Sequence, residues 1–210
     1  LRSTYRLRAG QQRLAIEDEV SNPSSEPAEL ELLYHINFGP PLLAPGTRVE
    51  AAIQRLAPRD RHSAQDVASW QDYGPPQPGS REFAHFAALR GDASGRTRVL
   101  LTAADGQQGV SLQFNLHQLP CFTLWKSQLA PDDGYVTGLE PGINFPNVRD
   151  FENSRGRVAT LEPGQSRRFT MTLEVHPDAV SVGQAREDVI QLRRGAAPII
   201  ERQPHADWSP

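Results

Sequence analysis

Apolar and polar side chains alternate in the stretch RLAIEDEV at positions 13–20. The same alternation runs through TYRLR at positions 4–8, and the residues AGQQ at positions 9–12 join the two stretches. Because successive side chains of a β-strand point to opposite faces, each stretch has one face that can be buried and one that can be wet. The start of the chain therefore predicts two antiparallel strands joined as a hairpin.

Short segments of the same kind continue to position 175. The chain contains 18 prolines and 16 glycines, and breaks of this frequency leave little room for long helices. We expect further strands at residues 29–38, 82–89, 97–103, 109–116, 121–126, 134–139, 156–161 and 166–175. Many short strands with Gly/Pro turns are typical of a sandwich or barrel. The sequence therefore predicts an all-β, predominantly antiparallel two-sheet sandwich over residues 1–178, with helix confined to short connections.

Two segments depart from this pattern. Residues 55–80 include the proline-rich GPPQPG at positions 74–79, and we expect them to form a long surface loop of the kind that is often functional. Residues 179–210 form a C-terminal extension, with a short helix expected at 184–194 and a tail from 203 that is loose or packed onto a partner. Since the chain opens on Leu1 directly into a strand, we also expect that an upstream segment is missing.

Composition argues against several classes of protein. Lys and Arg number 22 against 25 Asp and Glu, a net charge of -3, so no electrostatic field would gather nucleic acid or an anionic membrane. Cys121 is the only cysteine, which excludes an intrachain disulfide and a cysteine metal cage. No apolar run reaches the roughly 18 residues of a membrane span. We expect a cytoplasmic protein with neither nucleic-acid nor membrane partners.

A histidine and an asparagine lie in the strand-like stretch LYHINFG at positions 33–39, directly before two prolines. On an alternating strand His35 and Asn37 share one face, while Tyr34, Ile36 and Phe38 share the other. The first face is polar and the second can pack. A histidine at a strand end is more often a structural hydrogen-bonding residue than an acid or base, so both roles stay open.

A glutamate follows the strand in the stretch GYVTGLEPGINFPN at positions 134–147. The Pro, Gly and Asn residues after Glu140 hold the chain in a turn and leave this carboxylate at the end of the strand, where it can face a pocket. The simpler alternative is an exposed glutamate, since Glu is rarely fully buried.

Together the two stretches resemble the galactose mutarotase (aldose 1-epimerase-like) superfamily. Its members present a His-containing strand that ends in an aromatic-Asn motif and, much later, a Glu-Pro motif after a strand. The likeness is to an uncharacterised bacterial branch, through LYHINFGPPLL at 33–43, WK at 125–126, YVTGLEP at 135–141 and LEPGQ at 161–165. It covers roughly residues 14–175 and implies an antiparallel β-supersandwich.

The resemblance implies a mechanism in which a glutamate removes the proton of the anomeric hydroxyl while a histidine protonates the ring oxygen. Carried over to this chain, Glu140 is the base and His35 the acid, and no metal or cofactor is required. The family also uses a carboxylate on an intervening strand, commonly Asp, to bind sugar hydroxyls, and Glu82 is the positional candidate. A substrate-binding Arg and a further His come from upstream segments of the family that this chain lacks.

Five more side chains are candidates for binding the sugar: Asn37, Tyr73, His85, Trp125 and Lys126. Trp125 suits stacking on the C–H face of a sugar, and Lys126 suits donation to hydroxyls or a phosphate, although a core position for Trp125 fits equally well. Tyr73 lies in the proline-rich loop and would form part of a lid, or would help to anchor that loop. His85 is an alternative to Glu82 for facing the pocket, and a plain surface strand accounts equally well for both.

Three functions follow from these observations. The first is a mutarotase or related epimerase acting at the anomeric centre of an aldose or sugar phosphate, favoured by His35 together with Glu140. The second is a non-catalytic carbohydrate-binding sandwich, favoured by the lack of the upstream Arg, and the third is an accessory domain of a larger glycoside-processing enzyme. The expected partner is a small-molecule sugar or sugar phosphate, and a homodimer is compatible with the sequence.

Overall fold

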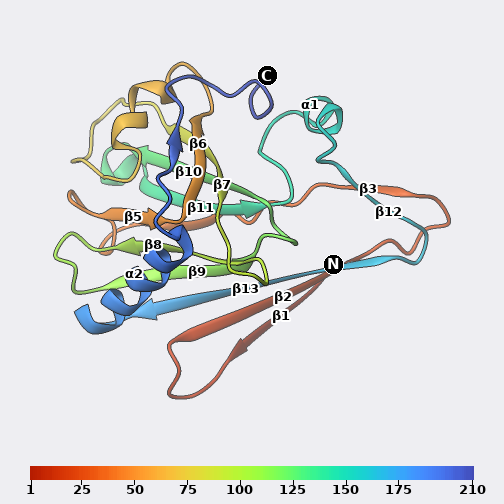
Figure 1. Ribbon diagram of the computed structural model, residues 1–210, viewed down its shortest axis with the longest axis horizontal. Coiled ribbons are helices and arrows are strands. Elements are labelled where there is room, and N and C mark those ends of the chain that lie inside the picture. Colours follow the sequence, from red (N-terminus) through yellow and green to blue (C-terminus); the bar gives the residue numbers. More distant parts are fainter.

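Two six-stranded sheets form the body of the protein in a computed structural model that describes residues 1–210 (Figure 1). The first sheet has the order β1 (Arg2–Leu7), β2 (Arg13–Ser21), β13 (Ser166–His176), β9 (Gly109–Asn115), β8 (Arg96–Thr102), β5 (Arg48–Ala51). The second has the order β14 (Ile199–Ile200), β6 (Ile53–Pro58), β7 (Phe83–Leu89), β10 (Cys121–Gln128), β11 (Tyr135–Gly142), β4 (Ile36–Phe38). A small ribbon pairs β12 (Ala159–Leu161) with β3 (Ala28–Leu30).

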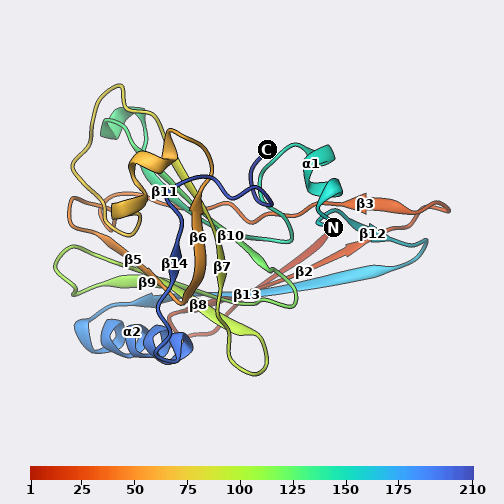
Figure 2. The same cartoon turned by 45° about the horizontal axis from the view of Figure 1, so that its top comes forward.

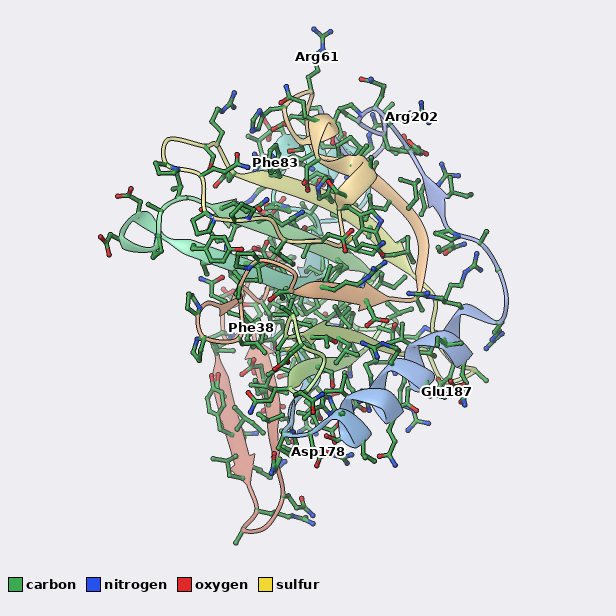
Figure 3. The ribbon with its side chains drawn as sticks, turned by 90° about the vertical axis from the view of Figure 1, so that its left-hand side faces the viewer. Phe38, Arg61, Phe83, Asp178, Glu187 and Arg202 are labelled. Atoms are coloured by element: carbon green, nitrogen blue, oxygen red, sulfur yellow. The ribbon has the colours of Figure 1, made fainter.

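The strand pairing confirms the predicted all-β, antiparallel sandwich. Neighbouring strands pair antiparallel throughout, apart from the parallel contact of β14 with β6. The predicted hairpin is present as β1 and β2, with Tyr5 opposite Ile16. It extends away from the body of the molecule (Figure 3).

The core lies between the two sheets. A single cluster of 23 buried residues joins side chains such as Leu56, Leu124 and Leu139 of the second sheet to Val99 and Leu112 of the first. Burying one such side chain contributes about 1.5–3 kcal/mol. The inner face of each sheet is therefore committed to packing, and only the outer faces are available for a site.

The predicted strand at residues 29–38 is wrong, because the chain changes sheets within it. β3 belongs to the small ribbon and β4 to the edge of the second sheet. Between them, Leu33 forms an isolated bridge with Gly142, and the backbone N–H of Leu32 donates to Asn144 Oδ1. The crossing residues are thus tied to the segment that follows β11.

The expected surface loop at residues 55–80 is largely packed against the body. β6 occupies its first residues, and two short 3₁₀ helices follow at Ser63–Gln65 and Val67–Ser69. Val67, Trp70 and Tyr73 are buried in the main core. These apolar side chains anchor the segment, which is why it does not stand away from the sandwich.

Helix α2 (Ala179–Arg193) covers part of the outer face of the first sheet, while α1 (Arg149–Ser154) lies beside the small ribbon (Figure 2). α2 begins five residues before the expected Gln184, because Asp178 caps it and accepts a hydrogen bond of 2.8 Å from the backbone N–H of Ser181. Neither helix combines the length and hydrophobicity needed to cross a membrane.

The C-terminal tail lies against the second sheet. β14 extends that sheet beside β6, and the ring of Trp208 lies 5.3 Å from the ring of Phe145. The carbonyl of Trp208 also accepts a hydrogen bond of 2.8 Å from Asn147. The tail expected to be loose or packed onto a partner is thus held by its own chain.

Candidate active site

The outer face of the second sheet brings the predicted acid and base together. Gly138 of β11 lies directly opposite Trp125 of β10 on one side and opposite Asn37 of β4 on the other. Directly paired residues share a face, and so do residues two apart on a strand. Glu140 is two residues from Gly138, and His35 is two residues from Asn37. Both side chains therefore lie on the same face of the sheet as Trp125.

His35 lies over the carboxylate of Glu140. Its Nε2 atom is 3.0 Å from Glu140 Oε1, and the histidine side chain is 48% exposed while that of the glutamate is 3% exposed. Oε1 nevertheless receives no well-aligned hydrogen bond. The two side chains are therefore in contact, but no aligned hydrogen bond fixes one to the other. The histidine is the one that faces solvent.

The tautomer of His35 is set by Asn37. Its Nδ1 atom is 2.8 Å from Asn37 Oδ1, and an amide oxygen only accepts hydrogen bonds. Nδ1 then carries a proton, and Nε2 is the atom that faces Glu140. Nε2 and Oε1 are thus in contact at 3.0 Å without an aligned hydrogen bond, and we call the two side chains the His35–Glu140 couple.

Glu140 is poised to exchange a proton near neutral pH. Burial raises its pKa, the nearby charge of Glu82 raises it further and Arg59 partly opposes them, with a net result of about 7. A general base works best when its pKa lies near the operating pH. Both the protonated and the ionised form are then populated at neutral pH.

Gly138 makes the close approach of His35 and Glu140 possible. A Cβ atom at this position would lie 2.3 Å from Glu140 Oε1 and 3.2 Å from His35 Cε1. Gly138 was not among the residues expected from the sequence to belong to the site. An isolated glycine within a strand pattern is a known signal of close approach, and it precedes Glu140 by two positions.

Trp125 forms a wall beside His35. The two rings meet edge to face with centroids 5.4 Å apart. The indole Nε1–H donates to Glu82 Oε2 at 2.7 Å, and the other oxygen of Glu82 accepts from both terminal nitrogens of Arg59 at 3.3 Å. Glu82, Trp125 and Asn37 thus lie with the predicted acid and base, and Arg59 is a member that the sequence analysis missed.

Lys126, His85 and Tyr73 lie on the opposite face of the same sheet, which corrects their expected place in the pocket. Lys126 Nζ donates to Asp66 Oδ2 at 2.6 Å, and His85 Nε2 is 2.9 Å from the same oxygen. The hydroxyl of Tyr73 is 2.6 Å from that of Thr137. Neighbouring residues of a strand face opposite sides, so Lys126 lies on the other side of the sheet from Trp125.

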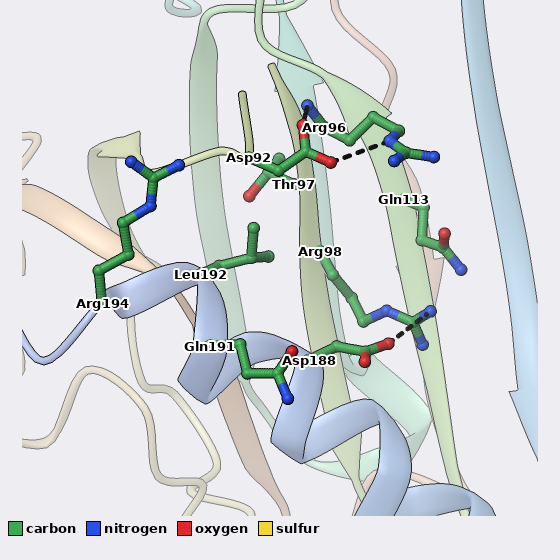
Figure 4. Close-up of a pocket in the computed structure, with 9 residues that line it drawn as sticks. All are labelled: Asp92, Arg96, Thr97, Arg98, Gln113, Asp188, Gln191, Leu192 and Arg194. Atoms are coloured by element: carbon green, nitrogen blue, oxygen red, sulfur yellow. Dashed lines mark hydrogen bonds and ion pairs between the residues drawn. The ribbon is translucent and has the colours of Figure 1, made fainter. Parts of the chain in front are cut away.

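A cavity of about 370 Å³ lies elsewhere, between α2 and the outer face of the first sheet (Figure 4). Its three arginines are engaged: Arg96 pairs with Asp92 at 3.0 Å, Arg98 pairs with Asp188 at 3.2 Å, and Arg194 donates to the carbonyl of Gly91 at 3.4 Å. No group of three or more His, Cys, Asp or Glu side chains is arranged to hold a metal ion. The His35–Glu140 couple on the second sheet is thus the best candidate for chemistry.

Comparison with known proteins agrees with this fold. The model of a family described as "Domain of unknown function (DUF4432)" matches residues 1–175. The crystal structure of a putative aldose 1-epimerase from Klebsiella pneumoniae is similar with a TM-score of 0.94 and 28% sequence identity. The match covers 97% of this chain and 53% of that one, so this chain spans about half the length of that relative.

More distant structures share the fold. A putative aldose 1-epimerase from Escherichia coli K12 has 21% identity and a TM-score of 0.55 over 82% of this chain and 58% of its own. A galactose mutarotase related enzyme from Lactobacillus acidophilus has 14% identity and a TM-score of 0.55 over 83% and 60%. No curated protein matches the sequence. These structures confirm the fold that the resemblance to galactose mutarotase-like proteins implied.

Proposed function

The chain belongs to the family described as "Domain of unknown function (DUF4432)", and from that premise we propose that it interconverts the anomers of an aldose or a sugar phosphate. One observation carries the proposal. His35 and Glu140 meet at 3.0 Å on an outer sheet face, and the pKa of Glu140 is about 7. The names of the Klebsiella and Escherichia relatives support the same reaction class.

The chemistry requires one base and one acid that act on the two oxygens bonded to the anomeric carbon of a cyclic sugar, the hydroxyl and the ring oxygen. Glu140 Oε1 accepts the proton of the anomeric hydroxyl while His35 Nε2 gives a proton to the ring oxygen. The bond between the anomeric carbon and the ring oxygen breaks, and the carbonyl of the open chain forms. Rotation of the aldehyde followed by the reverse steps closes the ring on either face, so protons and electrons balance over the cycle.

Substrate has to enter between the two groups. A functional base or acid must lie about 2.6–3.2 Å from the oxygen that it serves, and at present the two side chains face each other. Because the His35 side chain is half exposed, its ring can turn outward to admit the sugar. Trp125 then offers an aromatic surface to the C–H face of the sugar.

The test removes each proton carrier while its shape is retained. General acid–base catalysis typically contributes about 10²–10⁴-fold, so Glu140→Gln and His35→Asn should each slow anomer interconversion by at least about two orders of magnitude. Polarimetry with α-glucose, α-galactose and their 6-phosphates measures the rate. Glu17→Gln, which alters a surface ion pair with Arg6, is the control and should leave the rate unchanged. Activity that survives in both site variants would refute the proposal.

Sugar binding without turnover is a second candidate, and one observation favours it. His35 Nε2 and Glu140 Oε1 face each other at 3.0 Å, so the expected acid and base are occupied with each other, whereas the indole of Trp125 beside them offers an aromatic surface to a sugar. Saturable binding of a sugar by calorimetry, with no rate above the uncatalysed one, would identify this function.

A further inference from the structure

A continuous line of side-chain contacts runs from Arg59 to the His35–Glu140 couple. Arg59 holds Glu82 through both terminal nitrogens, Glu82 holds the indole of Trp125, and that indole packs edge-on against His35. The four residues lie in or next to four different strands of the second sheet, namely β6, β7, β10 and β4. The arrangement of the couple therefore depends on residues distant in sequence.

Arg59 is fixed in this position by its backbone. It directly follows β6, and its N–H donates to the carbonyl of Ala84 in β7 at 2.9 Å. Its Nε atom donates to Asp60 at 3.2 Å, and its side chain is 29% exposed. Arg61, two residues further on, points out to solvent (Figure 3), so Arg59 alone of this pair faces the site.

We propose that Arg59 is a positioning residue of this site, which acts through Glu82 to hold the indole of Trp125 against His35. The role of Arg59 in turnover rests on the proposed function, whereas its role in the geometry does not. A planar guanidinium holds a carboxylate with two donors at once. Without it, Glu82 is free to rotate, and the indole loses the partner that sets its orientation.

Arg59 and Glu82 also act on Glu140 through their charges, in opposite directions. The charged and titratable groups near Glu140 are His35, which precedes β4, Glu82, which precedes β7, and Arg59, which follows β6. The paired strand β10 contributes only neutral side chains to this face. Glu82 raises the pKa of Glu140 and Arg59 lowers it, so the loss of each should shift that pKa in an opposite sense.

Carboxyl and indole resonances measured by NMR test the proposal without any substrate. In Arg59→Gln the pKa of Glu140 should rise and the Trp125 Nε1–H resonance should move, while those of Trp70 and Trp208 stay in place. In Glu82→Gln, which keeps an acceptor for the indole, the pKa of Glu140 should fall below about 7. Arg55→Gln is the control: Arg55 lies in β6, near Arg59 in sequence, but it pairs with Glu201, which follows β14, and its loss should change neither signal.

A second variant separates position from charge. Arg59→Lys keeps the cation but loses the two-donor grip, so it should move the Trp125 resonance and leave the pKa of Glu140 close to that of the unmodified chain. An unchanged Trp125 resonance in both Arg59 variants would overturn the proposal. So would a pKa of Glu140 that shifts the same way in Arg59→Gln and Glu82→Gln.

The last test compares the turnover of Arg59→Gln with that of the unmodified chain. Small misplacements of catalytic groups cost up to about 10²-fold, so we expect Arg59→Gln to lower kcat/KM roughly tenfold and to move the acidic limb of the pH profile upward. If the NMR shifts appear but no variant, nor the unmodified chain, turns over a sugar, the positioning role stands and the proposed function fails. If turnover is present but indifferent to Arg59→Gln, the positioning role is refuted.

Discussion

Both faces of the second sheet carry ionisable groups, but these groups differ in how fully they are hydrogen-bonded. On the inner face, Lys126 and His85 converge on Asp66, and the lysine also donates to two backbone carbonyls of the adjoining segment. On the outer face, Glu140 keeps one oxygen without an aligned donor. A buried charge with a full set of partners holds structure together, whereas a carboxylate with an open oxygen beside a half-exposed histidine is available for proton transfer.

The pKa directions of the two carboxyls follow from this difference. Burial raises the pKa of Asp66, but the hydrogen bond from His85 and the charge of Lys126 outweigh it, and the net pKa lies below its ordinary value. Burial also raises the pKa of Glu140, where Glu82 adds to the effect and only Arg59 opposes it. The inner carboxylate is thus stabilised in its charged form, and the outer one is held ready to change form.

The largest expected effect on stability is that of breaking the inner cluster. Lys126→Met keeps the length and apolar stem of the side chain but leaves Asp66 without its cation. Removing one partner of a buried ion pair typically costs about 3–5 kcal/mol. We expect the free energy of unfolding, measured by urea denaturation at neutral pH, to fall by this amount.

The matched control is an exposed pair on the first sheet. Arg6→Gln removes the partner of Glu17 at the protein surface, and such pairs contribute about 0–1 kcal/mol. A Lys126→Met variant that loses no more stability than Arg6→Gln would show that the inner cluster is not a structural anchor.

A smaller effect, of opposite sign, is expected on the outer face. The folded-state pKa of Glu140, about 7, lies above its ordinary value of 4.5, so the folded chain binds this proton more tightly than the unfolded chain does. Ionisation therefore destabilises the fold as pH rises from about 4.5 through about 7, and the full cost, up to about 3 kcal/mol, is present above that range. Glu140→Gln removes the cost. Its free energy of unfolding should exceed that of the unmodified chain at pH 8 and match it at pH 4, and a variant less stable at pH 8 would contradict the raised pKa.

Much of the fold could be predicted from the sequence, because a two-residue period is a local property. The strands expected at 82–89 and 109–116 are present as β7 and β9 within one residue at each end. The strand expected at 29–38 failed because a change of sheet leaves no trace in the alternation. The early start of α2 was visible in principle, since Asp178 and Ser181 have the spacing of a capping pair.

The candidate site was less accessible, because it is built from contacts between strands. His35 and Glu140 were identified by their resemblance to a family motif. Lys126 was misplaced although the alternation itself sets it on the other face from Trp125. Arg59 was missed because it follows a strand that was not predicted, and only the pairing of β6 with β7 brings it to Glu82, 23 residues away.

The smallest expected effect on stability tests whether the close packing of Gly138, Glu140 and His35 on the outer face matters for activity. Gly138→Ala would place a methyl group 2.3 Å from Glu140 Oε1, and the tip of the glutamate side chain can move away from it without disturbing the backbone. We therefore expect stability to change little, while the displaced carboxylate lowers kcat/KM for anomer interconversion roughly tenfold. Gly183→Ala is the matched control, because a Cβ atom there meets nothing within 4 Å and alanine favours a helix by up to about 1 kcal/mol. Equal activity in the two variants would mean that the close approach of His35 to Glu140 is not needed for turnover, since the same added methyl group would then be harmless beside the couple and in open space.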